Sequence, residues 1–136
     1  MFKNVLVGVD GRANGRDAIA LASELVDPDG TLTLAHVHRD EAAEREGSHQ
    51  LLEEERNRAA VNAELVSVAA RSPGDGLHQQ AQELAADLLV VGCCSHGALG
   101  RVLLGDDSRA ALDGAPCTVA IATQGYADHL QPTAEL

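Results

Sequence analysis

The glycine-containing stretch from Gly92 to Ser108 has the residue types and spacing best suited to binding chemistry. Gly92 ends an apolar run, and Gly97, Gly100 and Gly105 follow before a segment of helical pattern. Such a loop can bring backbone N–H groups against a phosphate, and the N-terminus of the next helix adds partial positive charge. Glycines also serve tight strand-to-helix turns without any ligand. These residues alone therefore leave phosphate binding and a plain turn both open.

Other polar side chains have a structural explanation that is at least as good. His36 and His38 are two residues apart on an expected strand, so they face the same side and could chelate a metal. No third ligand lies at a suitable spacing, so packing and hydrogen bonding are favoured. Asp10 could act as a base or phosphoacceptor, but a receiver-like site needs neighbouring acids and a late-strand lysine, and the only lysine is Lys3. We predict no catalytic residue and no metal site.

The elements that must position these residues are strands and helices in alternation. Continuous apolar runs such as residues 5–9 and 87–92 are typical of strands buried on both faces. Alternation at this spacing predicts right-handed βαβ units and one parallel sheet with helices on both faces. The predicted strands are residues 5–9, 31–37, 64–70, 87–92 and 117–122, and the predicted helices are 16–26, 77–86, 106–113 and a largely exposed one within 39–62.

Three glycine-containing segments are read as breaks between these elements. Residues 28–30 (Pro-Asp-Gly) predict a turn that ends the first helix, and residues 73–76 predict a loop. Gly47 is assigned to an irregular stretch that precedes the exposed helix.

In such sheets ligands bind beyond the carboxyl ends of the strands, where the strand order reverses. This places Gly8 to Asp10 and the Gly92 loop at the expected site.

Composition excludes several functions. The chain has 136 residues and a formal net charge of −11. Binding to nucleic acid or anionic lipid is therefore disfavoured, because both attract proteins with a positively charged surface. No apolar run approaches the roughly 20 residues of a membrane span, and the first residues lack the layout of a signal peptide. Three cysteines, of which Cys93 and Cys94 are adjacent, indicate reduced, inert thiols in a cytosol. We expect a cytoplasmic protein that binds neither nucleic acid nor membrane.

The basic residues are unusual in kind, because Lys3 is the only lysine among ten basic residues. A strongly acidic, lysine-poor surface suits a protein in concentrated salt, where screening removes self-repulsion. A halophilic source is one hypothesis, and a GC-rich genome would give the same arginine bias.

Several segments closely resemble the universal stress protein family, in the same order and at matching spacing along nearly the whole chain. They are residues 5–11, 34–37, 86–105, 108–109 and 115–117. Nucleotide-binding members carry G-x2-G-x9-G-[S/T] where this chain has Gly92 to Asp106. The resemblance implies a doubly wound, five-stranded fold of the adenine nucleotide alpha hydrolase-like type with strand order 3-2-1-4-5. It also implies a homodimer that pairs through the last strand, Cys117–Ala122. We divide the chain into this domain, residues 1–123, and a loose polar tail, residues 124–136.

The resemblance also implies which residues form an adenine-nucleotide pocket. Asp10 matches the aspartate that ends the first strand, and Val37 matches the valine that lines the adenine. The ligand would be ATP, with Mg²⁺, or another adenine compound. The implied pocket residues are Gly8, Val9, Asp10, Val37, Val91, Gly92, Ser95, His96, Gly97, Gly105, Asp106, Asp107 and Ser108.

Two positions depart from the family motif, both on the phosphate side. Ser95 stands where the second glycine belongs, and Asp106 stands where the serine or threonine belongs. An aspartate caps a helix well but only accepts hydrogen bonds, and it puts negative charge where a phosphate would sit. At an effective dielectric of 20, two unit charges about 4 Å apart repel by ~4 kcal/mol. This repulsion would weaken the binding of a phosphate beside Asp106 by roughly three decades.

Three outcomes stay open for this pocket. The Asp106 carboxylate can replace the phosphate, a Mg²⁺ ion can bridge the two, or the pocket can take a less charged adenine compound such as adenosine. We favour weak or absent ATP binding in a small regulatory protein of the stress response, with slow ATP hydrolysis at most incidental. The alternative is a nucleotide-independent, homodimeric interaction module of the same fold.

Overall fold

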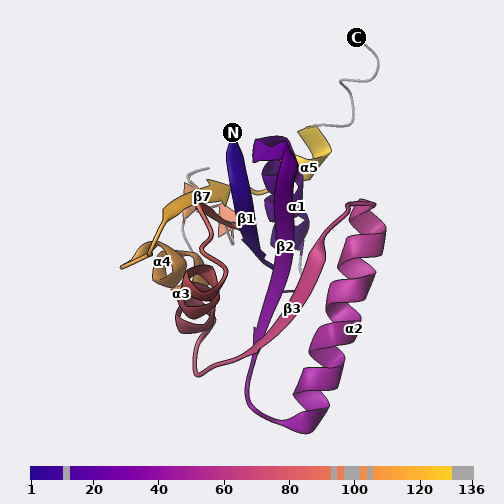
Figure 1. Cartoon of the computed structure of the whole chain (residues 1–136), viewed down its shortest axis with the longest axis vertical. Coiled ribbons are helices and arrows are strands. Elements are labelled where there is room, and N and C mark those ends of the chain that lie inside the picture. Colours follow the sequence, from indigo (N-terminus) through magenta and orange to yellow (C-terminus); the bar gives the residue numbers. More distant parts are fainter. Residues whose placement is uncertain (11–12, 93–94, 97–101, 104–105, 130–136) are drawn as a thin grey trace.

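The computed structural model describes residues 1–10, 13–92, 95–96, 102–103 and 106–129. Strands and helices alternate along the chain, as Figure 1 shows. The elements are β1 (Phe2–Gly8), α1 (Ala13–Leu25), β2 (Val26–His38), α2 (Ala42–Ala59), β3 (Glu64–Ala69), α3 (Pro73–Glu83), β4 (Leu88–Gly92), β5 (Ser95–His96), β6 (Val102–Leu103), α4 (Asp106–Leu112), β7 (Thr118–Ala122) and α5 (Tyr126–His129).

Five parallel strands form the main sheet in the order β3-β2-β1-β4-β7. Counted within this sheet the order is 3-2-1-4-5, so the predicted fold class is confirmed. The two-residue strands β5 and β6 pair antiparallel with each other in a separate ribbon. Within the described part of the chain, no helix is long and apolar enough to cross a membrane.

Each central strand is buried on both faces, which explains its continuous apolar run. Val5, Val7 and Val90 belong to a core cluster with residues of α1 and α2. Leu6 and Leu89 belong to the second cluster, with residues of α3 and α4. Because side chains alternate along a strand, neighbouring residues enter opposite cores. The helices therefore cover the sheet as two layers, α1 with α2 and α3 with α4 (Figure 1).

The predicted turn at residues 28–30 is wrong, because β2 runs through this segment. Phe2 pairs with Val26 but Asn4 pairs with Thr31, so β2 carries extra residues and bulges here. The Asp27 carboxylate stabilises the bulge by accepting a 2.9 Å hydrogen bond from the backbone N–H of Asp29. This hydrogen bond, followed by Lys3 at 3.1 Å, holds the pKa of Asp27 below its ordinary value. Turn-forming residues thus make an irregularity within a strand.

The predicted loop at residues 73–76 is also wrong, since α3 begins at Pro73. Ser72 caps the helix by accepting a 3.2 Å hydrogen bond from the Asp75 N–H, and proline is favourable at the first helical position. Gly74 is needed for packing instead, because a Cβ there would lie 2.7 Å from the Cβ of Ala110 in α4. The glycine therefore permits close contact between two helices and does not break one.

Gly47 lies inside α2, so the irregular stretch predicted before this helix is wrong as well. A Cβ at Gly47 would meet nothing within 4 Å. The predicted exposure of this helix is confirmed, because most residues of α2 are exposed and only Ser48, Leu52 and Glu55 are buried.

Part of the expected loose tail is attached to the domain. The buried carboxylate of Asp17 in α1 accepts 2.9 Å hydrogen bonds from the backbone N–H groups of Gly125 and Ala127. The Tyr126 hydroxyl donates a 2.8 Å hydrogen bond to Glu24 of α1. Residues 124–129 thus lie against α1, whereas residues 130–136 lie outside the described chain. The boundary at residue 123 stays a prediction.

Candidate functional site

The strand order reverses between β1 and β4, and the predicted site lies at the carboxyl ends of these strands. From β1 the chain adds β2 and β3 on one side and β4 and β7 on the other. Val9 continues β1 beyond Gly8 and donates a 2.8 Å hydrogen bond from its N–H to the Ala35 carbonyl oxygen. Val9 is buried, whereas Asp10 is exposed at the sheet edge. Gly92 ends β4 at the same edge.

Gly8 has a packing role that the sequence did not reveal. A Cβ at Gly8 would lie 2.8 Å from Leu77 Cδ1 and 3.4 Å from Val91 Cγ1. Gly76 shows the same relationship to β2, because a Cβ there would lie 2.8 Å from both methyl groups of Val37. Both glycines let α3 approach the sheet closely. Gly8 thus has a structural reason to be glycine, whether or not a ligand binds nearby.

A cavity of about 460 Å³ lies at the carboxyl ends of β2 and β3, where these strands meet α2 and the start of α3. Val37, the residue expected to line an adenine, forms part of its wall. The cavity residues are His36, Val37, His38, Arg39, Glu44, Gly47, Ser48, Leu51, Ala70, Arg71, Ser72 and Pro73.

A hydrogen-bonded chain of three side chains lies beside this cavity. Ser67 of β3 donates a 2.9 Å hydrogen bond to Ser48 Oγ, and Ser48 Oγ lies 2.7 Å from His36 Nδ1. Burial lowers the pKa of His36, His38 lowers it further, and Asp10 opposes the shift. His36 therefore favours its neutral form, whose Nδ1 can accept a hydrogen bond from the Ser48 hydroxyl.

The sequence did not indicate this hydroxyl–imidazole pair, because its members come from different elements. Ser48 is only 2% exposed and carries two hydrogen bonds, which suits a structural role better than nucleophilic attack. His38 also uses its ring, through a hydrogen bond between Nδ1 and the carbonyl oxygen of Arg39. Among the described residues, no group of three or more histidine, cysteine, aspartate or glutamate side chains is arranged to hold a metal ion.

The phosphate side of the predicted pocket is described only in part. Gly97 and Gly105 lie outside the described residues. Ser95 and His96 form β5, and Asp106, Asp107 and Ser108 open α4, but the side chains of these five residues lie outside the description. Gly8, Val9, Asp10, Val91 and Gly92 are brought together at the strand-order reversal, with Val37 on the neighbouring strand.

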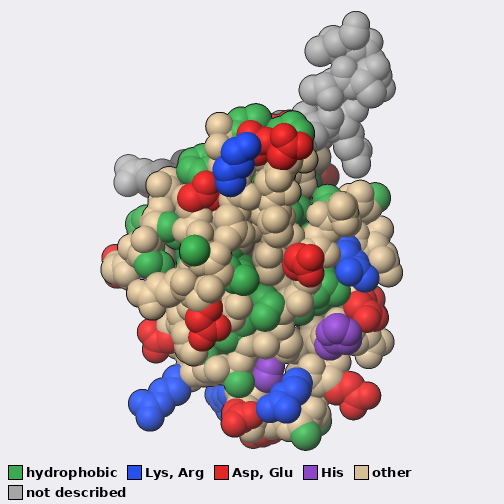
Figure 2. All heavy atoms as spheres, viewed as in Figure 1, with side chains coloured by type: hydrophobic (Ala, Val, Ile, Leu, Met, Phe, Trp, Pro, Cys, Tyr) green, Lys and Arg blue, Asp and Glu red, His purple; other side chains and the backbone are tan. Residues whose placement is uncertain are grey.

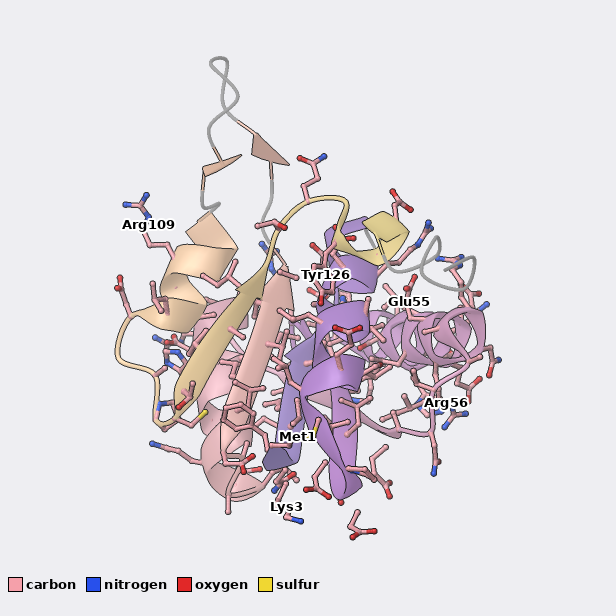
Figure 3. The ribbon with its side chains drawn as sticks, turned by 90° about the horizontal axis from the view of Figure 1, so that it is seen from above. Met1, Lys3, Glu55, Arg56, Arg109 and Tyr126 are labelled. Carbon is pink, nitrogen blue, oxygen red and sulfur yellow. The ribbon has the colours of Figure 1, made fainter. Side chains whose placement is uncertain are left out.

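Two arginines close to the Gly92 loop in the sequence, Arg101 and Arg109, could contact a phosphate or be solvated surface residues. Arg109 is exposed, and Figure 3 shows it pointing away from the sheet. Arg101 lies outside the described residues. On the face drawn in Figure 2, acidic and basic side chains are interspersed, and no broad basic area appears.

The outer strand β7 pairs with β4, and in the described part of the chain no strand pairs with its other edge. It begins at Thr118, one residue later than predicted. Cys117 precedes it, and burial, followed by the charge of Asp87, raises the pKa of its thiol. Cys93 and Cys94 lie outside the described residues.

Comparisons with known proteins agree with the fold. A sequence model described as the Universal stress protein family matches residues 1–123. A Thermus aquaticus protein, "Universal stress protein in QAH/OAS sulfhydrylase 3'region", is 29% identical over 134 residues, which cover 88% of this chain and 97% of the relative.

Solved structures extend this similarity to three dimensions. One is a universal stress protein in complex with cAMP, with a TM-score of 0.73 and 26% identity over 90% of this chain and 98% of that one. A universal stress protein from Archaeoglobus fulgidus, 15% identical, has a TM-score of 0.70 over 90% of this chain and 99% of its own. At that identity the second similarity supports the fold alone.

Proposed function

Because the chain belongs to the universal stress protein family, we propose that it is a small regulatory protein of the stress response with a pocket for an adenine compound. The observation that carries this proposal is the reversal of strand order between β1 and β4, with Asp10 and Gly92 at the same edge. Ligands of open α/β sheets bind at this position. The relative solved with cAMP supports an adenine compound as the ligand.

The pocket favours an adenine compound of low charge over ATP. Helix α4 begins at Asp106, and a negative charge in the first turn interacts favourably with the helix dipole that would otherwise hold a phosphate. Asp107 increases the negative potential at this helix start. A ligand with one negative charge, or none, meets far less repulsion than ATP does, unless Mg²⁺ intervenes.

Calorimetric titration with adenosine, cAMP, and ATP with and without Mg²⁺ tests this preference. We expect the wild-type protein to bind adenosine or cAMP more tightly than ATP, and Asp106→Ser to gain at least tenfold in ATP affinity. Asp113→Ser is the matched control, because it removes one negative charge just beyond the opposite end of α4. Equally tight ATP binding by the wild type and by Asp106→Ser would overturn the repulsion argument.

The alternative is a homodimeric interaction module that has lost the nucleotide. The outer edge of β7, with which no strand of the described residues pairs, favours it, because such an edge can pair with a second copy of the chain. Sedimentation with and without the adenine compounds separates the two functions. A dimer that binds none of them supports the module, and ligand binding supports the first proposal.

Neither function includes catalysis. The Ser48–His36 pair is used for hydrogen bonding within the packed structure. We also propose a cytoplasmic location, because three thiols in a chain of this size suit a reducing compartment.

A further inference from the structure

A second cavity, of about 550 Å³, lies between α1, the C-terminal part of α2, and α5. It shares no lining residue with the cavity at the ends of β2 and β3. Its walls combine small apolar side chains with charged groups. The lining residues are Arg16, Ile19, Ala20, Ser23, Glu24, Glu55, Arg58, Ala59, Val61, Ala127 and Asp128.

A buried carboxylate in this wall is only half satisfied. Glu55 is 3% exposed, and its Oε1 accepts a 2.9 Å hydrogen bond from Arg58 Nη1. Its Oε2 is also buried and has no hydrogen-bond partner among the described residues. A buried carboxylate oxygen without a donor is costly and requires an explanation. Glu55 (labelled in Figure 3) shares this cavity wall with residues of α1 and α5.

The charges around the cavity leave a negative balance. Glu24 and Asp128 add two carboxylates to that of Glu55, against the guanidinium groups of Arg16 and Arg58. Arg58 is already paired with Glu55, so among the described lining residues Arg16 is the cation that is left beside the two other acids. Glu24 also accepts a hydrogen bond from the Tyr126 hydroxyl, which holds α5 against this side of α1.

The remaining walls suit a short hydrocarbon chain. Ile19 is fully buried, and Ala20, Val61 and Ala127 are partly buried around the cavity. The hydroxyl of Ser23 is directed back to its own helix, where it donates a 2.8 Å hydrogen bond to the Ile19 carbonyl oxygen. The wall of the cavity thus contains one unsatisfied buried acceptor, and its other sides combine negative charge with apolar surface.

We propose that this cavity binds a primary alkylammonium ion, with the ammonium group donating to Glu55 Oε2 and the alkyl chain against the apolar walls. Oε2 is screened from solvent, so contact requires a small rotation of the Glu55 side chain, as is common when ligands bind. A water molecule occupies only about 30 Å³ and leaves most of the cavity unfilled. This site is independent of the adenine pocket.

NMR titration of the whole chain with n-butylammonium chloride tests the proposal, with n-butanol and sodium chloride as reference titrants. We expect saturable shifts of the amides around the cavity in α1, α2 and α5 with n-butylammonium, and at least tenfold weaker binding of n-butanol. Glu55→Gln keeps the shape and removes the charge, so it should weaken n-butylammonium binding at least tenfold. Glu54→Gln, an exposed neighbour, is the matched control and should bind as the wild type does.

A second variant keeps the test decisive if Glu55→Gln does not fold. Ala20→Leu extends a larger apolar side chain into the cavity and leaves Glu55 in place, and it should weaken n-butylammonium binding at least tenfold. The proposal is overturned if the wild type shows no saturable binding or if n-butanol binds equally well. It is also overturned if either Glu55→Gln or Ala20→Leu, once shown to be folded by circular dichroism, retains wild-type affinity.

Discussion

Ser48 on α2 and His36 on β2 are joined by a hydrogen bond of 2.7 Å between Ser48 Oγ and His36 Nδ1. Ser67 of β3 extends this connection to a second strand, through its 2.9 Å hydrogen bond to Ser48. A mostly exposed helix is thereby attached to the sheet by polar contacts near the carboxyl ends of two strands. This attachment complements the apolar contact of Leu52, which is fully buried in the same helix.

Replacing Ser48 by alanine should lower stability. The substitution leaves the polar atoms of His36 and Ser67 without their buried partner, which costs about 1–3 kcal/mol. Urea unfolding followed by circular dichroism measures this loss. Ser23→Ala is the control, because its exposed hydroxyl bonds only to its own helix. An equal effect of both substitutions would contradict a special role for Ser48.

The lowered pKa of His36 predicts a pH dependence of stability. Burial and His38 lower this pKa from its ordinary value of 6.5, and Asp10 only partly opposes them. The unfolded state therefore binds a proton more readily than the folded state does. The contribution of His36 is fully present above pH 6.5 and is lost as the pH falls through 6.5 toward the lower folded-state pKa.

Urea titrations between pH 5 and pH 8 test this dependence. In His36→Gln, the decrease in the free energy of unfolding on acidification should be smaller than in the wild type. His49→Gln removes an exposed histidine of α2 and serves as the control. An unchanged pH profile in His36→Gln would show that other groups cause the dependence.

Gly74 and Gly47 should respond in opposite directions to the same substitution by alanine. A Cβ at Gly74 would lie 2.7 Å from the Cβ of Ala110, so Gly74→Ala should separate α3 from α4 and cost about 1–3 kcal/mol. A Cβ at Gly47 meets nothing within 4 Å, so Gly47→Ala should stabilise α2 by up to about 1 kcal/mol. Urea unfolding of the two variants checks both signs, and destabilisation by Gly47→Ala would contradict the open environment described for it.

Asp17 should control the attachment of α5 to α1. Asp17→Ala removes the acceptor of two backbone N–H groups, those of Gly125 and Ala127. We expect faster amide hydrogen exchange at both residues and a stability loss of about 1–3 kcal/mol. Asp29→Ala, at an exposed position in β2, is the control. Unchanged exchange at Gly125 and Ala127 would show that other contacts hold the helix.

The high net charge of −11 predicts that salt stabilises the protein. Screening reduces the repulsion between carboxylates, and the Debye length falls from about 10 Å at 0.1 M salt to about 3 Å at 1 M. Thermal unfolding should therefore shift to higher temperature as sodium chloride rises to 1 M. Full stability at low ionic strength would count against a halophilic origin.

The sequence was sufficient to predict the fold, and it placed residues of two strands at one edge of the sheet. Continuous apolar runs such as Val5–Val9 identify buried parallel strands, and their alternation with helices leaves few possible topologies. The carboxyl ends of parallel strands meet at one edge, so Asp10 and Gly92 could be placed there in advance. The resemblance to a known family then supplied the strand order.

Only the tertiary structure decided what the glycines do and which polar side chains meet. The sequence pattern predicts a loop at Gly74, because local patterns cannot show that Ala110, distant in sequence, approaches it closely. The same reason hid the contact of Ser48 with His36 and the half-satisfied carboxylate of Glu55. Periodicity reports the burial of each residue along its own helix or strand, whereas these contacts depend on how separate elements pack against one another.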